Sequence, residues 1–427
     1  GATTAALKAS KGEALLCRAY SHFVLANLFC MPYNPATADN YLGIPYMDHA
    51  ETDLNPRYDR GTLKEVYEMI GKDIEEGIPL IDDTSYAVPK YHFNYKAACC
   101  FASRYYLFIQ DWDNAIKYAT EALTSNPTSL LRDYDAIAAI PNGTSRHQAY
   151  VQSSSSANFL VQAATSSAGT VFGWYTTAGR YAHGKLQGTY ETVQPKYGGP
   201  WGNSVYFKAG HAVLASSGKY ILPRIWYTFQ YTDPVAGTGY SKAVSVLFCM
   251  EEALLNRAEA YVMKMQEDPS ALDSALADMN MYASNLFSSG FTPMTEESIK
   301  KWATETYPNY SELYVGKTSE TSPQTLNPKK KLFAPPYNAL EKGGTQESML
   351  QALLFMRRYQ FLHEGMRWFD TRRFGITVYR YTLDEDDETV LQITDQISDE
   401  DGTPDPRRAL QLPSDVIAAG LTPNPRN

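Results

Sequence analysis

Two stretches of the sequence place large aromatic side chains beside hydrogen-bonding ones: FGWYTTAGRY at 172–181 and YGGPWGNSVYF at 197–207. A sugar ring has C–H faces that stack on aromatic rings and hydroxyls that need planar polar partners, so this mixture predicts a glycan-binding site. The candidate stacking residues are Trp174, Tyr175, Tyr181, Trp201 and Tyr206, and the candidate polar partners are Arg180 and Asn203. The same rings could instead fill a small core beneath long loops, and both interpretations stay open.

A third stretch, RRYQFLHEGMRWFDTRRFG at 357–375, is rich in arginines and aromatic residues. Its arginines could bind an anionic ligand, or their stems could stack on the rings as a structural clamp. We favour the clamp, because such stacks are a common packing device. Gly365 would let the backbone turn between two helical pieces, and Arg367 and Asp370, three residues apart, could pair on the second piece.

Motifs for catalysis are missing from the sequence, which has no nucleophile elbow, no phosphate-binding loop and no HExxH. His22 and His363 lie among apolar neighbours, where a hydrogen-bonded core histidine is expected. Glu251 and Glu252 are adjacent, so on a helix they would point in different directions and are poor candidates for glycoside hydrolysis. The acidic run DEDDE at 384–388 lacks the pattern of a calcium loop. We therefore predict no catalytic residues, no metal and no cofactor.

Composition narrows the class of protein. A net charge of −9 and a pI of about 5.4 give no basic face, so nucleic acid is not an expected partner. No apolar run approaches the ~20 residues that span a bilayer, so the chain as given is expected to be soluble. The cysteines are odd in number and lie in apolar helical runs, which favours small buried thiols over disulfides or zinc. They are Cys17, Cys30, Cys99, Cys100 and Cys249.

Helical periodicity predicts the elements that must position these residues. One face is apolar over Glu13–Phe29, which Pro32 follows, and over Leu63–Leu80, where Val66 and three isoleucines are spaced by four. Residues 95–127 predict two helices with a break near Gln110 and Asp111. Further helices are predicted at Met250–Met265, at Ala271–Phe287 and from Glu347 onward.

The pair at 95–127 resembles a tetratricopeptide repeat, a helical hairpin of 34 residues. The small, aromatic, alanine and proline positions of the repeat fall at Ser103, Tyr106, Ala115, Ala122 and Pro127. The fold is therefore predicted to be mainly α, with a helical repeat scaffold over 13–127, 245–287 and 347–375. Loops and short strands at about 129–243 are predicted to carry the ligand, and a second irregular insertion occupies about 288–344.

Five segments, taken in order, resemble the SusD/RagB family: GEALLCRAYSHFVLANLF, TLKEVYEMIGKDIEEGIPLI, KAACCFASRYYLFIQDWDNAIKYATEAL, EEALLNRAEAY and RRYQFLHEGMRWFDTRRFG. The last segment keeps the family pattern at Glu364, Gly365, Arg367, Trp368, Phe369, Asp370 and Arg373. Met356 and Gln360 stand where the family usually has glutamates. The resemblance covers most of 1–427 as one SusD-like domain and is weakest in 129–242 and 288–344.

The resemblance implies a cell-surface lipoprotein of the Bacteroidetes outer membrane that binds nutrient glycans without enzymatic activity. It also implies a partner, a SusC-like TonB-dependent transporter over which such proteins form a lid. From the resemblance we expect this chain to lack the family's N-terminal segment, with the cysteine that carries the lipid anchor. RagB-type members suggest a different ligand, a peptide or protein, as the alternative.

Overall fold

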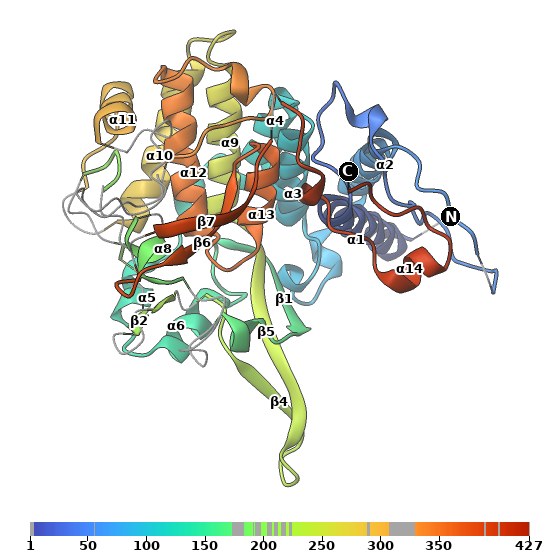
Figure 1. Ribbon diagram of the computed structural model, residues 1–427. Helices are drawn as coiled ribbons and strands as arrows, with labels where there is room; N and C mark the ends of the chain where they lie inside the picture. Colours follow the sequence, from blue (N-terminus) through green and yellow to red (C-terminus); the bar gives the residue numbers. More distant parts are fainter. Residues whose placement is uncertain are drawn as a thin grey trace.

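Pairs of helices make up most of the body of the protein (Figure 1). In this computed structural model the longer helices are α1 (Ala5–Phe29), α2 (Leu63–Gly77), α3 (Tyr95–Phe108), α4 (Trp112–Leu123), α9 (Met250–Lys264), α10 (Ala271–Leu286), α12 (Thr345–Gln360) and α13 (Met366–Arg373). The remaining helices are α5 (Tyr134–Ala139), α6 (Gly143–Tyr150), α7 (Ala168–Val171), α8 (Lys185–Tyr190), α11 (Glu296–Lys301) and α14 (Ser414–Ala418). The predicted mainly α, tetratricopeptide-like scaffold is confirmed.

The structure describes most of the chain. The described residues are 4–54, 56–172, 183–190, 192, 198–202, 207–208, 212–214, 219–221, 224–287, 291–306, 329–387, 390–399 and 402–426. Within these ranges no helix is both long enough and apolar enough to cross a membrane.

Short polar side chains set the ends of the first helices. Thr62 caps α2 by accepting from the Glu65 amide at 3.2 Å, while the Glu65 carboxylate accepts from the Thr62 amide at 2.8 Å. These reciprocal bonds form a capping box, which satisfies two amides that the helix leaves unpaired. Gln110, with φ 64°, interrupts the run between α3 and α4, at the predicted break.

Helix α3 lies at the centre of the core, since every residue from Ala97 to Phe108 is buried. Alanines at its surface let α4 and α9 pack closely against it. A buried ion pair joins α3 to α9, because Arg104 donates to the two oxygens of Glu252 at 2.6 and 2.8 Å. This bidentate geometry fixes the relative position of the two helices as well as stabilising the charges.

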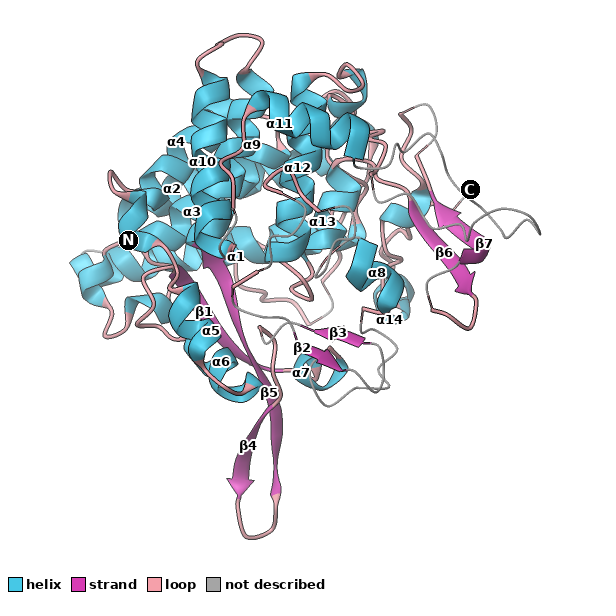
Figure 2. Ribbon diagram, turned by 90° about the vertical axis from the view of Figure 1, so that its left-hand side faces the viewer, coloured by secondary structure: helices cyan, strands magenta, loops and turns pink. Residues whose placement is uncertain are grey.

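In the described part of the chain the strands form three small antiparallel sheets. The largest has the order β1 (Asn158–Thr165), β5 (Thr238–Cys249) and β4 (Thr228–Asp233). The other two pair β2 (Ala212–Leu214) with β3 (Lys219–Ile221) and β6 (Val378–Leu383) with β7 (Val390–Ile397). The β1–β5–β4 sheet hangs below the helices in both ribbon views (Figures 1 and 2).

The outer half of the β1–β5–β4 sheet has only two strands. Strand β5 pairs with β1 between Lys242 and Cys249, whereas it pairs with β4 between Thr238 and Lys242. We call residues 228–242 the β4–β5 ribbon, which projects from the body of the protein (Figure 2). Most of its residues are exposed or half-buried because no other element covers them.

The C-terminal tail returns to the first helix. Asn424 donates to the Phe29 carbonyl at 2.8 Å and accepts from Arg60 at 2.8 Å. Arg60, which is buried, also donates to the Thr422 carbonyl at 3.0 Å. The tail therefore satisfies carbonyl groups at the end of α1 that the helix leaves unpaired.

Candidate functional site

Of the seven residues predicted to bind a glycan, only one lies in the described part of the chain. The six that fall outside the described residues are Trp174, Tyr175, Arg180, Tyr181, Asn203 and Tyr206. Their roles stay predictions.

Trp201, the seventh, lies in the hydrophobic core. Its side chain is 2% exposed and stacks on Phe287, with 4.3 Å between ring centroids and 29° between planes. Phe355 contacts the same indole at 5.5 Å. A Cβ atom at Gly199 would lie 2.3 Å from the ring, so the backbone there presses against it. The ring therefore has no face open to a ligand here. The ligand-binding role of Trp201 stays a prediction.

The arginine-rich stretch forms a structural clamp, as expected. Arg373 is buried and forms a bidentate ion pair with Glu259 of α9. Arg357 donates to Asp370 at 3.0 Å and to Asn256 at 3.0 Å, also inside the protein. These contacts hold α12 and α13 against α9 and leave the two guanidinium groups no role in binding a ligand.

The suggested pairing of Asp370 with Arg367 in this stretch is wrong, because Asp370 has other partners. The Asp370 carboxylate contacts Arg357 and Arg373, the latter at 3.6 Å, and not Arg367. Asp370 is 1% exposed and faces the core, where Arg357 and Arg373 also lie, whereas Arg367 is only half-buried. Gly365 does provide the predicted turn, with φ 83°.

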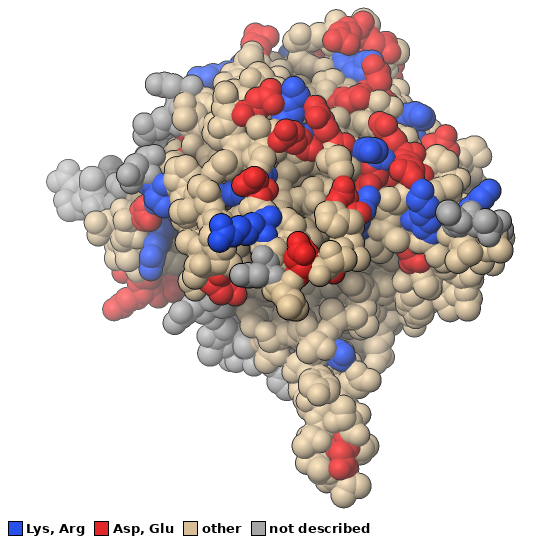
Figure 3. All heavy atoms as spheres, turned by 90° about the vertical axis from the view of Figure 1, so that its right-hand side faces the viewer, with Lys and Arg blue, Asp and Glu red and all other residues tan. Residues whose placement is uncertain are grey.

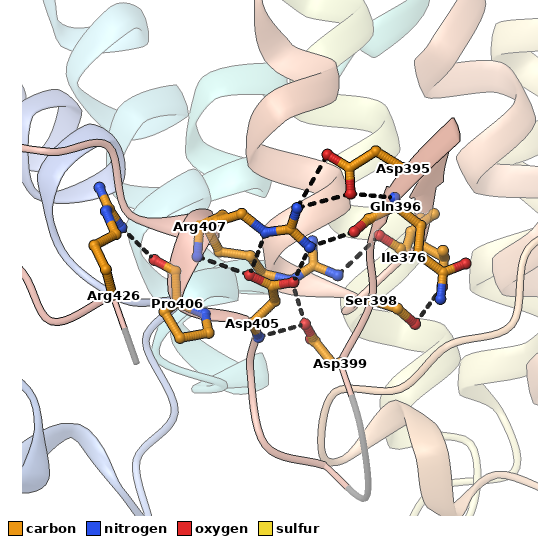
Figure 4. Close-up of polar contacts among 11 residues, drawn as sticks. Ile376, Asp395, Gln396, Ser398, Asp399, Asp405, Pro406, Arg407 and Arg426 are labelled. Carbon is orange, nitrogen blue, oxygen red and sulfur yellow. Dashed lines mark hydrogen bonds and ion pairs between the residues drawn. The ribbon is translucent and has the colours of Figure 1, made fainter. Parts of the chain in front are cut away.

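A polar cluster near the C-terminal end is also structural (Figure 4). Arg407 donates to Asp395 at 2.9 Å and to Asp405 at 2.7 Å, which occupies both edges of its guanidinium. Its buried neighbour Arg408 pairs with Asp399 and donates to the carbonyls of residues 371 and 376. The cluster thus fastens the tail to α13 and β7, and its donors are already used.

The expectations are met for four of the five cysteines and for His22, but not for His363, whose Nε2 is buried without a hydrogen-bond partner in the described part of the chain. All five cysteines are free thiols and four are buried, but Cys17 is exposed because it faces away from the stripe of α1 that packs in the core. His22 is hydrogen-bonded as expected, to the Arg18 carbonyl at 2.8 Å and to the Met47 amide at 3.0 Å. Among the described residues no three metal-binding side chains come together.

A surface groove of about 740 Å³ is the candidate site that the structure adds. We call it the Tyr91 groove. It is lined by Tyr91, Gln148, Val151, Gln152, Ser153, Ser154, Val161, Gln162, Ala163 and Val244. Its volume is typical of a small-molecule site. None of these side chains carries a charge.

Five segments form the walls and floor of the Tyr91 groove. Tyr91 ends a turn of 3-10 helix at Pro89–Tyr91, Gln148 lies on α6, and residues 151–154 form the loop after α6. The floor comes from β1 and β5, where Ala163 pairs with Val244. The pairing of β1 with β5 thus brings together two parts of the floor that are about 80 residues apart in the sequence.

Buried polar contacts hold these walls in place. Asn158, at the start of β1 and 0% exposed, donates to the carbonyls of Tyr150 at 2.8 Å and Gln152 at 2.9 Å. On the other side, Asn94 donates to the Phe159 carbonyl at 2.5 Å. Lys90 donates to the Ser155 carbonyl, and burial lowers the pKa of its ammonium group. Since these donors are used within the protein, the wall is preorganised before any ligand arrives.

The side chains that line the Tyr91 groove are suited to a neutral polar ligand. Tyr91 is 59% exposed and offers a ring face, while Gln148, Gln152 and Gln162 offer exposed amides. An amide can donate and accept at once, which matches a hydroxyl group of a sugar. Sequence reasoning placed the ligand in 129–243, which includes most of this lining, but it missed these glutamines because they carry no aromatic signal.

Comparison with known proteins identifies relatives of this architecture. Residues 2–107 match the model of a SusD-like family that is described as starch-binding and associating with the outer membrane. No curated protein sequence matches the chain. Among solved structures, a SusD superfamily protein from Bacteroides thetaiotaomicron is similar over 100% of this chain and 80% of its own, with 18% identity and a TM-score of 0.59. A SusD-like carbohydrate binding protein from Bacteroides vulgatus is similar over 98% and 77%, with 16% identity and a TM-score of 0.55. Identities this low show a shared fold.

Proposed function

We propose that this chain is a member of the SusD-like family whose model matches residues 2–107, that it binds a glycan without modifying it, and that the Tyr91 groove is a site of binding. The observation that carries the proposal is the lining of the groove. An exposed aromatic ring stands beside exposed amides and hydroxyls over an apolar floor of Val161, Ala163 and Val244. A sugar needs both kinds of contact, since its C–H faces stack and its hydroxyls require hydrogen-bonding partners.

Binding without hydrolysis fits the same lining. A glycosidase needs two carboxyl groups on either side of the scissile bond. None of the ten residues that line the groove is an aspartate or glutamate. The groove therefore supports a binding role.

The family suggests the setting in which binding would act. We propose that the protein works at the outer membrane as a lipoprotein and passes its glycan to a SusC-like TonB-dependent transporter. The aromatic residues predicted from the sequence belong to this proposal as a further contact region for the glycan. They are the aromatic residues Trp174, Tyr175, Tyr181 and Tyr206, together with their predicted polar partners Arg180 and Asn203.

Isothermal titration with a panel of neutral and acidic oligosaccharides tests the proposal. Tyr91→Ala should weaken binding of a neutral glycan roughly tenfold, the effect of losing about 1.4 kcal/mol. Tyr231→Ala is the matched control, because Tyr231 is 58% exposed but does not line the groove. Equal affinities of the wild type and the Tyr91 variant for a confirmed glycan would refute the role of the groove.

A peptide ligand is the second candidate, and one observation favours it. Strand β1 is the end strand of its sheet in the described part of the chain, and its residues Val161–Ala163 line the groove. An extended peptide could add to this edge through main-chain hydrogen bonds. Titration with peptides that show heat of binding, where no oligosaccharide does, would select this alternative.

A further inference from the structure

The floor of the Tyr91 groove continues onto the β4–β5 ribbon. Residues directly opposite each other in an antiparallel pair share a face, and so do residues two apart on one strand. Ala163 pairs with Val244, which places both in the groove floor. Two residues along, Lys242 pairs with Thr165 on one side and with Thr228 on the other.

The next pair on this face brings another exposed aromatic ring. Tyr240 lies opposite Gln230, and the pairing between Gly239 and Val246 of β5 is regular, without a bulge that would reverse the faces. Tyr240 is 57% exposed and Gln230 is exposed. Tyr240 is four residues from Val244, so it lies about 14 Å beyond the groove floor at the usual rise of a strand.

The surface between the groove and Tyr240 is polar and nearly uncharged. It carries the hydroxyl groups of Thr165 and Thr228, and the ammonium group of Lys242, which already donates to Thr165 at 2.9 Å. The projection formed by the ribbon is mostly uncharged in the space-filling view as well (Figure 3). This face thus repeats the composition of the groove, an aromatic ring with neutral polar groups.

We infer that the ligand is an oligosaccharide longer than the Tyr91 groove, which continues over this face of the ribbon and stacks on Tyr240. The inference rests on the proposed function and adds the length of the ligand and a second stacking residue. A chain that reaches both rings gains the second contact as an intramolecular event, so its affinity exceeds that of a fragment held by the groove alone.

The opposite face of the same ribbon provides the control. Tyr231 is 58% exposed, close to the exposure of Tyr240, but it pairs with Gly239 and therefore faces the other way. There it packs edge-on against Phe229 at 4.9 Å. Replacing either tyrosine removes an aromatic side chain of similar exposure from a surface strand.

The experiment measures affinity against ligand length. The probes are a short and a long oligosaccharide of one neutral polysaccharide that the wild-type protein binds, and the proteins are the wild type, Tyr240→Ala, Tyr231→Ala and Tyr91→Ala. We expect Tyr240→Ala to weaken binding of the long oligosaccharide roughly tenfold, or about 1.4 kcal/mol, and to leave binding of the short one unchanged. Tyr231→Ala should bind both as the wild type does, and Tyr91→Ala should lose affinity for both.

The outcomes separate the inference from the function on which it rests. If Tyr240→Ala and Tyr231→Ala bind the long oligosaccharide equally well while Tyr91→Ala is impaired, the groove binds glycans but the ribbon does not, and the inference is overturned. A loss with Tyr240→Ala that is the same for both lengths would overturn it too. If the wild-type protein binds no oligosaccharide, the proposed function itself fails.

Discussion

Replacing Trp201 with alanine distinguishes a packing residue from a ligand-binding one. The indole is 2% exposed and contacts Phe287 and Phe355, with centroid distances of 4.3 and 5.5 Å. Truncating a buried tryptophan to alanine costs about 3–5 kcal/mol, because apolar contacts are lost and a cavity remains. Gly199 lies against the ring but has no side chain. Only a shift of the backbone could therefore fill the space, and that would disturb the chain around it. We therefore expect a loss in the upper half of that range.

Denaturation by urea, followed by circular dichroism, measures this loss as a lower transition midpoint. Trp201→Phe is the matched control, since it keeps an aromatic ring against Phe287 and should cost much less. Glycan affinity of the folded variants should stay close to that of the wild type. The reasoning would be refuted if Trp201→Ala kept the wild-type midpoint and lost its affinity for a glycan.

Two further predictions concern buried charged groups of the arginine-rich stretch. Arg373→Met leaves Glu259 buried without its partner and should lower the free energy of unfolding by about 3–5 kcal/mol. Arg372→Met removes a guanidinium with two unpartnered nitrogens, so it should lower the free energy of unfolding by under about 1 kcal/mol. Equal losses of stability for the Arg373 and Arg372 variants in parallel denaturation curves would contradict this account. Burial lowers the pKa of His363 to about 4, so the unfolded chain binds its proton first and stability should fall by about 3 kcal/mol as pH drops from 6.5 to 4. Burial raises the pKa of Glu364 to about 7, so the contribution of this carboxyl group to stability falls as pH rises from 4.5 to 7. The variants His363→Gln and Glu364→Gln should therefore show opposite slopes of stability against pH. Parallel slopes would count against both assignments.

The sequence predicted the helices where their pattern was strong. The stripe on α2 and the break at Gln110 gave bounds close to those of the structure. The start of α1 was missed by eight residues, because the turns between Thr4 and Glu13 are mostly exposed and are fixed by a cap on Thr4 and not by an apolar stripe. Local pattern is informative when a helix buries one face and much less so when a cap alone defines its start.

The candidate site was harder to predict for a physical reason. Tyr91, Gln152 and Val244 are far apart in sequence, and they meet in one groove through the pairing of β1 with β5 and the buried hydrogen bonds of Asn94 and Asn158. Single-sequence reasoning sees neighbours along the chain, so it selected compact aromatic clusters. One of these, around Trp201, contains a ring that the helices need for their own packing.

The contact between the tail and α1 also bears on the order in which the molecule assembles. Asn424 meets the Phe29 carbonyl across 395 positions, whereas Asn27 meets Tyr67 across 40. Closing the longer loop costs only about 2 kcal/mol more entropy, so the tail can form a stable contact. When the chain folds from its amino end, however, the hydrogen bond from Arg60 to the Thr422 carbonyl cannot form until the tail is in place. The first helix pair to appear is thus completed only when the tail arrives, because Asn424 provides the shorter of the two side-chain hydrogen bonds to the Phe29 carbonyl.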